Sequence, residues 1–250
     1  MVRIEEIHRV PDIFPHLRRL DIRRFSGSWA IDDEQIEELH HQQRRGSNAR
    51  YSWAEMTYVS GHLDGLYILA FAKHIRRVDI HDLWLLQNNQ GRLRAVLSAA
   101  QPTHLSLDLV HPRQSPRHSA LPQLLDMSHH VLYLRLSMKW WSADGIDMEE
   151  FREHLLMTLR TLRLKHLHLV LIRPHGSRRH PVVTFMYEVD LELLAQNILD
   201  ACPTLEFICF NLAQRAAHFE MSPSLEGIPR CRAICLSVAQ ARITALWRSA

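Results

Sequence analysis

Apolar residues recur along this chain in one frame: an apolar residue, two variable residues, an apolar residue, one variable residue and a final apolar residue. Clear copies stand at Leu17/Leu20/Ile22, Ile75/Val78/Ile80, Leu164/Leu167/Leu169 and Leu205/Ile208/Phe210. Looser copies stand at Trp53/Met56/Tyr58, Leu105/Leu107, Val131/Leu134/Leu136 and Cys231/Ile234/Leu236. The alternation at the end of each frame predicts a short β-strand with one apolar face.

Helical patterns fill most of the gaps between the frames, whose middle residues are 22 to 41 residues apart. Asp32 and Gln35 have the spacing of a capping box at the start of the segment Asp32–Arg45. Asp147 and Asp190 precede apolar runs with helical spacing, so each is expected to begin a helix. Weaker helical patterns cover His62–Ala72 and Gly91–Ala100.

The chain is therefore predicted to repeat a helix, a tight turn and a strand. One such unit cannot bury both its helix stripe and its strand face, but stacked units cover one another. Strands joined by helical crossovers should pair in parallel. We predict an α/β solenoid that forms a single repeat domain over residues 1–250, with about eight irregular helix–strand units. Residues 1–16 are expected to cover the first unit in part, and residues 238–250 to form a C-terminal capping helix.

Two stretches carry a family resemblance: "RYSWAEMTYVSGHLDGLYILAFAKHIRRVDI" and "ILDACPTLEFICF". They resemble the C-terminal repeat region of fungal F-box/leucine-rich-repeat proteins, over most of the chain from about Phe14 to Leu236. The resemblance implies a curved horseshoe with a parallel sheet on its concave face and helices on its convex face. It also implies that the horseshoe holds a protein substrate for a ubiquitin ligase of the F-box (SCF) type.

The sequence departs from this family at its start, because no F-box pattern stands ahead of the first frame at Leu17. A ligase adaptor is therefore an expected partner only if an F-box lies upstream. The asparagine ladder of regular repeats is also missing. Since a solenoid needs a cover over its first coil, we expect the chain to belong to a longer protein or to pair with something at that end.

Composition narrows the class of protein further. With 46% hydrophobic and 23% charged residues, the chain of 250 residues is expected to be globular rather than disordered. The net charge of +3 is far from that of a dedicated nucleic-acid binder. Glu5, Glu6 and Pro11 interrupt any signal-peptide pattern. Because four cysteines give no disulfide framework, the expected location is the cytosol or nucleus, with no membrane partner.

Variable positions of the frame lie on the strand face opposite the core, so they are the candidate partner-binding residues. On the concave face these are Arg19, Asp21, Arg77, Asp79, His104, Asp108, Tyr133, Arg135, His166 and His168. Two loops, "HPRQSPRH" and "RPHGSRRH", follow strands and form the predicted rim of the stack. Their cations could grip a phosphate or an acidic peptide, and they are Arg113, Arg117, Arg178 and Arg179.

Catalytic motifs are missing from the sequence: neither GxSxG, a P-loop, GxGxxG nor HExxH occurs. His166 and His168 could share a face, but no further metal ligands accompany them, so neither a metal nor a cofactor is expected. The expected function is a non-catalytic protein–protein interaction module. The alternative is a nucleic-acid or phosphate binder that uses the arginine- and histidine-rich rim. A hydrolase is a third option, which a deep pocket with a Ser/His/Asp cluster would support.

Overall fold

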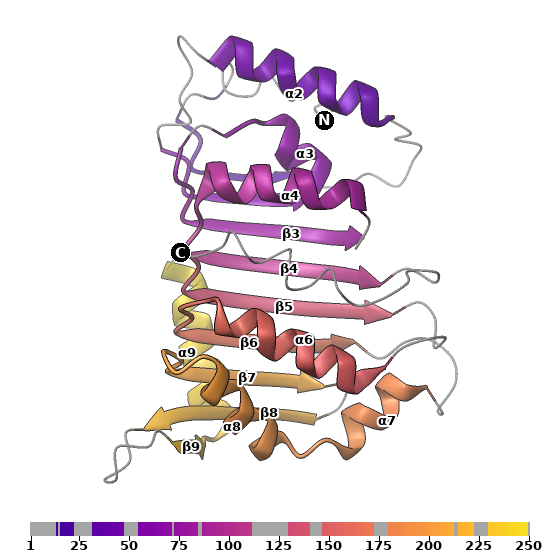
Figure 1. Cartoon of the computed structure of the whole chain (residues 1–250). Helices are drawn as coiled ribbons and strands as arrows, with labels where there is room; N and C mark the ends of the chain where they lie inside the picture. The colour runs from indigo at the N-terminus through magenta and orange to yellow at the C-terminus, as the bar shows by residue number, and fades with distance from the viewer. Residues whose placement is uncertain are drawn as a thin grey trace.

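A computed structural model gives the fold of residues 14, 16–22, 32–47, 55–71, 73–84, 87–111, 130–140, 147–172, 180–212, 215–222 and 230–249. These residues form an α/β structure around one nine-stranded sheet, in which the strands follow one another in sequence order (Figure 1). The strands are β1 (Arg19–Ile22), β2 (Tyr58–His62), β3 (Arg77–Trp84), β4 (His104–His111), β5 (Tyr133–Trp140), β6 (His166–Ile172), β7 (Phe207–Leu212), β8 (Arg215–Ser222) and β9 (Arg230–Ala233).

Seven helices are present in the part of the chain that the structure describes. They are α2 (Asp33–Ser47), α3 (Leu63–Ile68), α4 (Gln87–Ala100), α6 (Met148–Arg160), α7 (Pro181–Glu188), α8 (Leu191–Ala201) and α9 (Leu236–Ser249). Within these ranges no helix is both long enough and apolar enough to cross a bilayer.

The strand register confirms the predicted alignment of the apolar frames. Each of the first six strand pairs, from β1·β2 to β6·β7, is parallel. The middle residues of the frames are partners across these pairs, in one row of Leu20, Val59, Val78, Leu105, Leu134, Leu167 and Ile208. From Val59 onward every member of the row is at most 1% exposed. The row therefore forms the continuous centre of the hydrophobic core.

The second frame was predicted three residues too early. Val59, not Met56, occupies the middle of the second strand, and Gly61 takes the place of the last apolar residue. A Cβ atom on Gly61 would lie 2.9 Å from the carbonyl oxygen of Ile22, closer than real Cβ contacts come. Glycine is needed there because β1 passes so near, and it hides the apolar pattern of this frame.

The prediction of an eighth helix–strand unit at Cys231/Ile234/Leu236 is wrong. Strand β8 follows β7 after only two residues, a connection too short for a parallel crossover, so the chain reverses. Strands β8 and β9 therefore pair antiparallel. Cys231 lies in β9, whereas Leu236 begins α9 and is 60% exposed. The parallel part of the sheet ends at β7.

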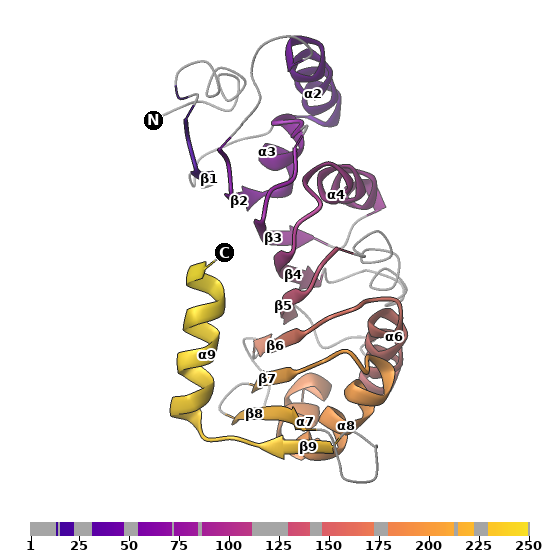
Figure 2. The same ribbon diagram turned by 90° about the vertical axis from the view of Figure 1, so that its left-hand side faces the viewer.

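Helices α2 to α8 cover one face of the sheet (Figure 2). Their predicted start signals are confirmed: the Asp32 carboxylate accepts the backbone N–H of Gln35 at 2.8 Å, and Asp147 and Asp190 each accept two backbone N–H groups at the starts of α6 and α8. Helix α7 was not predicted from the sequence. It begins at Pro181, a residue favoured at the first helical position, and His180 caps it by accepting the N–H of Val182 on its Nδ1.

Helix α9 lies on the other face of the sheet, which we call the inner face because the sheet curves around it (Figure 2). The helix expected over residues 238–250 thus forms over Leu236–Ser249, but it does not stack on the last unit as a cap. It runs back along the sheet until the ring of Trp247 stands beside Arg77 of β3 and His104 of β4. The reversal at β8 and β9 delivers the chain to this face.

Candidate functional site

The inner face presents side chains in rows that run across the strands. The first row is Arg19, Tyr58, Arg77, His104, Tyr133, His166 and Phe207. The second row, two residues further along each strand, is Asp21, Ser60, Asp79, Ser106, Arg135, His168 and Cys209. The structure thus brings nine of the ten predicted concave-face residues together in two rows, and Asp108 lies two residues beyond Ser106 on β4.

Part of this face is an aromatic stack covered by α9. The rings of His104 and Tyr133 are stacked at 4.1 Å, and those of Tyr133 and His166 at 4.9 Å. Ile243, Leu246 and Trp247 of α9 lie over this stack and leave a space of only about 10 Å³. His104 is 3% exposed as a result. We call the part of the inner face formed by β4–β7 and α9 the covered half.

The histidines of the covered half are held in their neutral form. Burial lowers the pKa values of His104, His166 and His168 to about 4 each, and nearby cations act in the same direction. Nδ1 of His166 and of His168 has no hydrogen-bond partner among the residues that the structure describes. Neutral rings stacked on one another present aromatic surface, so this half is suited to packing rather than to binding anions.

Arg77 and Asp79 are engaged with each other and with α9. The guanidinium Nη2 of Arg77 lies 2.6 Å from Oδ2 of Asp79, and Nη1 donates to the carbonyl oxygen of Trp247 at 2.7 Å. The same guanidinium stands over the rings of Tyr58 and Trp247, 4.7 and 4.8 Å from their centroids. These two predicted contact residues therefore anchor the end of α9.

The remaining part, β1–β3 with Asp108 of β4, begins at the end of α9 and is charged. We call it the open half. Arg19 and Asp21 on β1 are exposed. Further along, His81 links two strands: its Nε2 lies 2.7 Å from Oγ of Ser60, and its Nδ1 lies 3.3 Å from Oδ2 of Asp108. The hydrogen bond to Asp108 raises the pKa of His81, and that of Asp108 is lowered although its burial acts in the opposite direction.

Ser60, His81 and Asp108 are the residue types of a hydrolase triad, joined in the same order. Of these three residues, the sequence pattern pointed only to Asp108. His81 lies where the register between β3 and β4 shifts, between Ile80 and Leu83, and the apolar frame does not reveal such a bulge. However, Ser60 is only 2% exposed, so a substrate carbonyl cannot reach its hydroxyl. The arrangement satisfies a buried hydroxyl group.

The other predicted features add no site among the residues that the structure describes. Arg113, Arg117, Arg178 and Arg179 lie outside the described residues. Within the described ranges, no three His, Cys, Asp or Glu side chains converge as a metal site would require, and all four cysteines are free.

The outer, helix-bearing face has two features that sequence reasoning missed. The first is Arg92 of α4, which is 6% exposed and lies between three helices. Its guanidinium is within 2.9 to 3.3 Å of carboxylate oxygens of Asp33, Glu37 and Asp64. The spacing of Asp33 and Glu37, one helical turn apart on α2, was the only signal in the sequence. Arg92 fastens α2, α3 and α4 together.

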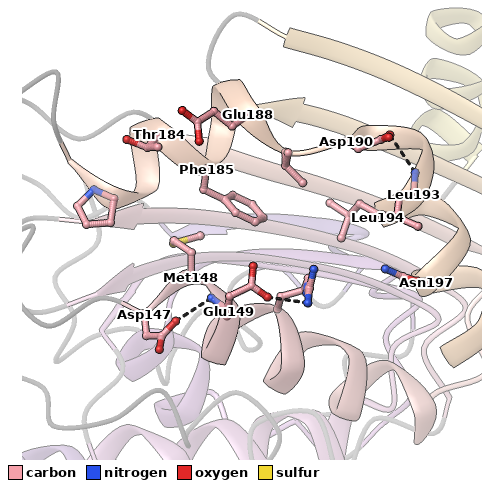
Figure 3. Close-up of a pocket in the computed structure, with 13 residues that line it drawn as sticks. Asp147, Met148, Glu149, Thr184, Phe185, Glu188, Asp190, Leu193, Leu194 and Asn197 are labelled. Atoms are coloured by element: carbon pink, nitrogen blue, oxygen red, sulfur yellow. Dashed lines mark hydrogen bonds and ion pairs between the residues drawn. The ribbon is translucent and has the colours of Figure 1, made fainter.

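The second is an open groove of about 900 Å³ between α6, α7 and α8 (Figure 3). Met148, Phe185, Val189, Leu193 and Leu194 provide its apolar lining. Its carboxylates are Asp147, Glu149, Glu188 and Asp190. The single cation in the lining, Arg152, lies 2.6 Å from Oε2 of Glu149.

Comparison with known protein families, with curated proteins and with solved structures finds no match to this chain. Its function is therefore argued from its own geometry.

Proposed function

We propose that the chain is a non-catalytic protein–protein interaction module, built as a leucine-rich-repeat-like solenoid whose inner face receives the partner. The observation that carries this proposal is the seating of α9: an amphipathic helix already packs on the aromatic rows through Ile243, Leu246 and Trp247. A face that accepts a helix of its own chain has the chemistry to accept a segment of another protein.

The partner is proposed to bind on the open half, next to the end of α9. Arg19 and Asp21 are exposed there, and the side chain of His81 is 41% exposed. Opposite charges in adjacent positions favour a polar, mixed-charge protein surface over a polyanion. Trp247 would stand at the border of the contact, where aromatic side chains commonly contribute much of the binding energy.

A role in substrate recognition for an F-box type ubiquitin ligase is the finer form of this proposal, and it rests on the family resemblance alone. It predicts that the protein expressed at its native locus is captured together with a ligase adaptor and a cullin. Capture of the partner without these two proteins would remove the ligase role and leave the binding role intact.

The binding role is tested with a charge exchange on β1. The full chain carrying Arg19→Asp and Asp21→Arg is compared with the wild type by affinity capture and quantitative mass spectrometry from the native cell. The matched control is Arg94→Asp on the exposed side of α4. Proteins that bind the inner face should be lost by the exchange and kept by the control.

Two outcomes would contradict the proposal. One is that no captured protein depends on the exchange. The other is that the captured material is removed by nuclease and its binding falls steeply with salt, as expected when several phosphates are neutralised. That second result would favour the nucleic-acid alternative, with its arginine-rich rim.

A further inference from the structure

The groove between α6, α7 and α8 lies on the face of the sheet opposite the proposed partner-binding surface, and its charge is the reverse of that of the chain. Four carboxylates and one guanidinium line it, an excess of three negative charges, whereas the whole chain carries +3. Asp147 and Asp190 stand at helix N-termini, and each of these supplies about half a positive charge. The N-terminus of α7 at Pro181 also lines the groove, so the correction is about one and a half charges, and the groove stays negative.

The acidic residues at the two ends of the outer face differ in how many of them are paired with a cation. Between α2, α3 and α4, the buried guanidinium of Arg92 contacts three carboxylates, two on α2 and one on α3. Between α6, α7 and α8, Arg152 contacts Glu149 alone, and Glu188 has no ion pair among the described residues. A cation from outside the chain would complete this second cluster as Arg92 completes the first.

The walls of the groove are fixed by hydrogen bonds. The carboxylates of Asp147 and Asp190 hold the first turns of α6 and α8 (Figure 3). Arg215 of β8 directs Nη1 to the carbonyl oxygens of Met186, Tyr187 and Val189, which secures the corner between α7 and α8. Arg215 keeps its positive charge in these hydrogen bonds, but it is not among the residues that line the groove. The groove is therefore preformed, which lowers the entropic cost of binding.

The apolar lining is partly open to solvent. Leu193 on α8 is 56% exposed, although large apolar side chains gain free energy from burial. Phe185 is half-buried beside it, over a floor that includes Met148 and Leu194 (Figure 3). An open groove cannot enclose most of a small ligand's surface, as small-molecule sites do. It can take the apolar stripe of a helix laid along it.

We propose that this groove is a second docking surface, which binds a basic amphipathic helix of a partner protein. Leucine-like side chains of the helix would contact Leu193, Phe185 and Met148. Lysine or arginine side chains flanking the stripe would face Glu188 and the neighbouring carboxylates. The negative lining repels nucleic acid and anionic lipid, so a protein segment is the partner that the charge favours.

The probe is a synthetic fluorescent helical peptide with leucines at positions i, i+3, i+4 and i+7 and lysines on either side of this stripe. Its affinity for the full chain is measured by fluorescence anisotropy at fixed salt. A peptide with glutamate in place of every lysine controls for apolar binding. We expect the basic peptide to bind and the acidic peptide to bind about tenfold more weakly or not at all.

Paired variants locate the binding site. Glu188→Lys and Leu193→Ser change the groove, and each should raise the dissociation constant by about tenfold. Glu192→Lys and Met157→Ser are the matched controls, because they are exposed residues of α8 and α6 that do not line the groove. Both should bind the peptide as the wild type does.

The proposal is overturned if the groove variants bind as tightly as the controls, or if the acidic peptide binds as well as the basic one. Circular dichroism of each variant verifies that its helices are intact. The charge exchange at Arg19 and Asp21 should leave peptide binding unchanged. Failure of this second surface is thereby distinguished from failure of the proposed inner-face function.

Discussion

The covered and open halves of the inner face move the pKa values of their histidines in opposite directions. His104, His166 and His168 lie under or beside α9, and burial lowers their pKa values to about 4. His81 lies outside α9, and its hydrogen bond to Asp108 raises its pKa. Strands of the same frame therefore give two different surfaces. What decides the direction of the shift is whether burial or a hydrogen-bonded carboxylate has the larger effect on the imidazole.

The largest expected effect is acid destabilisation of the covered half. A folded-state pKa of about 4, against an ordinary value of 6.5, means that the unfolded chain binds protons first. The contribution of these histidines to the free energy of unfolding is therefore fully present above pH 6.5 and is lost as the pH falls toward 4. One imidazole shifted by two to three pH units accounts for about 3 kcal/mol, so the free energy of unfolding in urea should be lower at pH 4 than at pH 7 by an amount of that order.

A substitution of one histidine tests whether the covered half causes this loss of stability at low pH. His166→Phe retains an aromatic ring against Tyr133 but cannot be protonated, so it should reduce the loss between pH 6.5 and 4. His74→Phe changes an exposed histidine and should leave the pH profile unchanged. If both variants lose stability as the wild type does, the buried imidazoles are not the cause.

The next effect in size is release of the end of α9. Trp247→Ala removes the ring that stands 5.9 Å from His104 and 4.8 Å from the Arg77 guanidinium. The expected cost is about 1–3 kcal/mol, since the ring is only half-buried. Amide hydrogen exchange over Leu236–Ser249 should become faster.

The neighbouring exposed residue provides the comparison for this variant. Arg248→Ala should change stability by no more than about 0.5 kcal/mol and leave exchange in α9 unaltered. Unchanged exchange in Trp247→Ala would mean that the contacts at Arg77 and His104 do not hold the helix.

A smaller effect is expected in the open half, with the opposite sign. Because the folded-state pKa of His81 is raised, its contribution is present at low pH and is lost as the pH rises through that value. The imidazole is 41% exposed, so the contribution should stay below about 1 kcal/mol. NMR titration should show the pKa of His81 falling in Asp108→Asn, and an unchanged value would rule out Asp108 as the cause.

The last prediction is that Ser60 does not react as a nucleophile. Ser60 has a histidine and a carboxylate in line with it, but its residue is 2% exposed. A fluorophosphonate probe should therefore leave Ser60 unlabelled, as judged by mass spectrometry of the intact chain. Labelling that disappears in both Ser60→Ala and His81→Gln would show a reactive serine and would overturn the non-catalytic proposal.

The parallel strands could be predicted from the sequence because their apolar positions repeat whatever the connections contain. Leu20, Val78, Leu167 and Ile208 fall in one row, as the frame requires. The second frame was missed because close packing against Ile22 demands a glycine where the pattern expects an apolar residue.

The position of α9 could not be predicted from the sequence. An apolar stripe indicates that a helix packs against something, but it does not identify the surface. Ile243, Leu246 and Trp247 would fit an end of the stack as well as its inner face. The burial of His104 follows from the same cause, although polar residues at variable positions were expected to face solvent. Asp79 is buried against its neighbours Arg77 and Tyr58, which both contact its carboxylate. Arg92 and the groove on the outer face depend on contacts between separate helices, which no single repeat contains.

The row from Leu20 to Ile208 has a consequence for how such a chain can change in length. Successive members are separated by as few as 19 residues, between Val59 and Val78, and by as many as 41, between Leu167 and Ile208. Lengthening a connection costs little, because loop entropy grows only slowly with length. One residue inserted within a strand would instead turn every following side chain to the opposite face. Insertions and deletions should therefore be tolerated between strands, whereas an insertion within a strand needs a bulge, such as the one between Ile80 and Leu83 of β3.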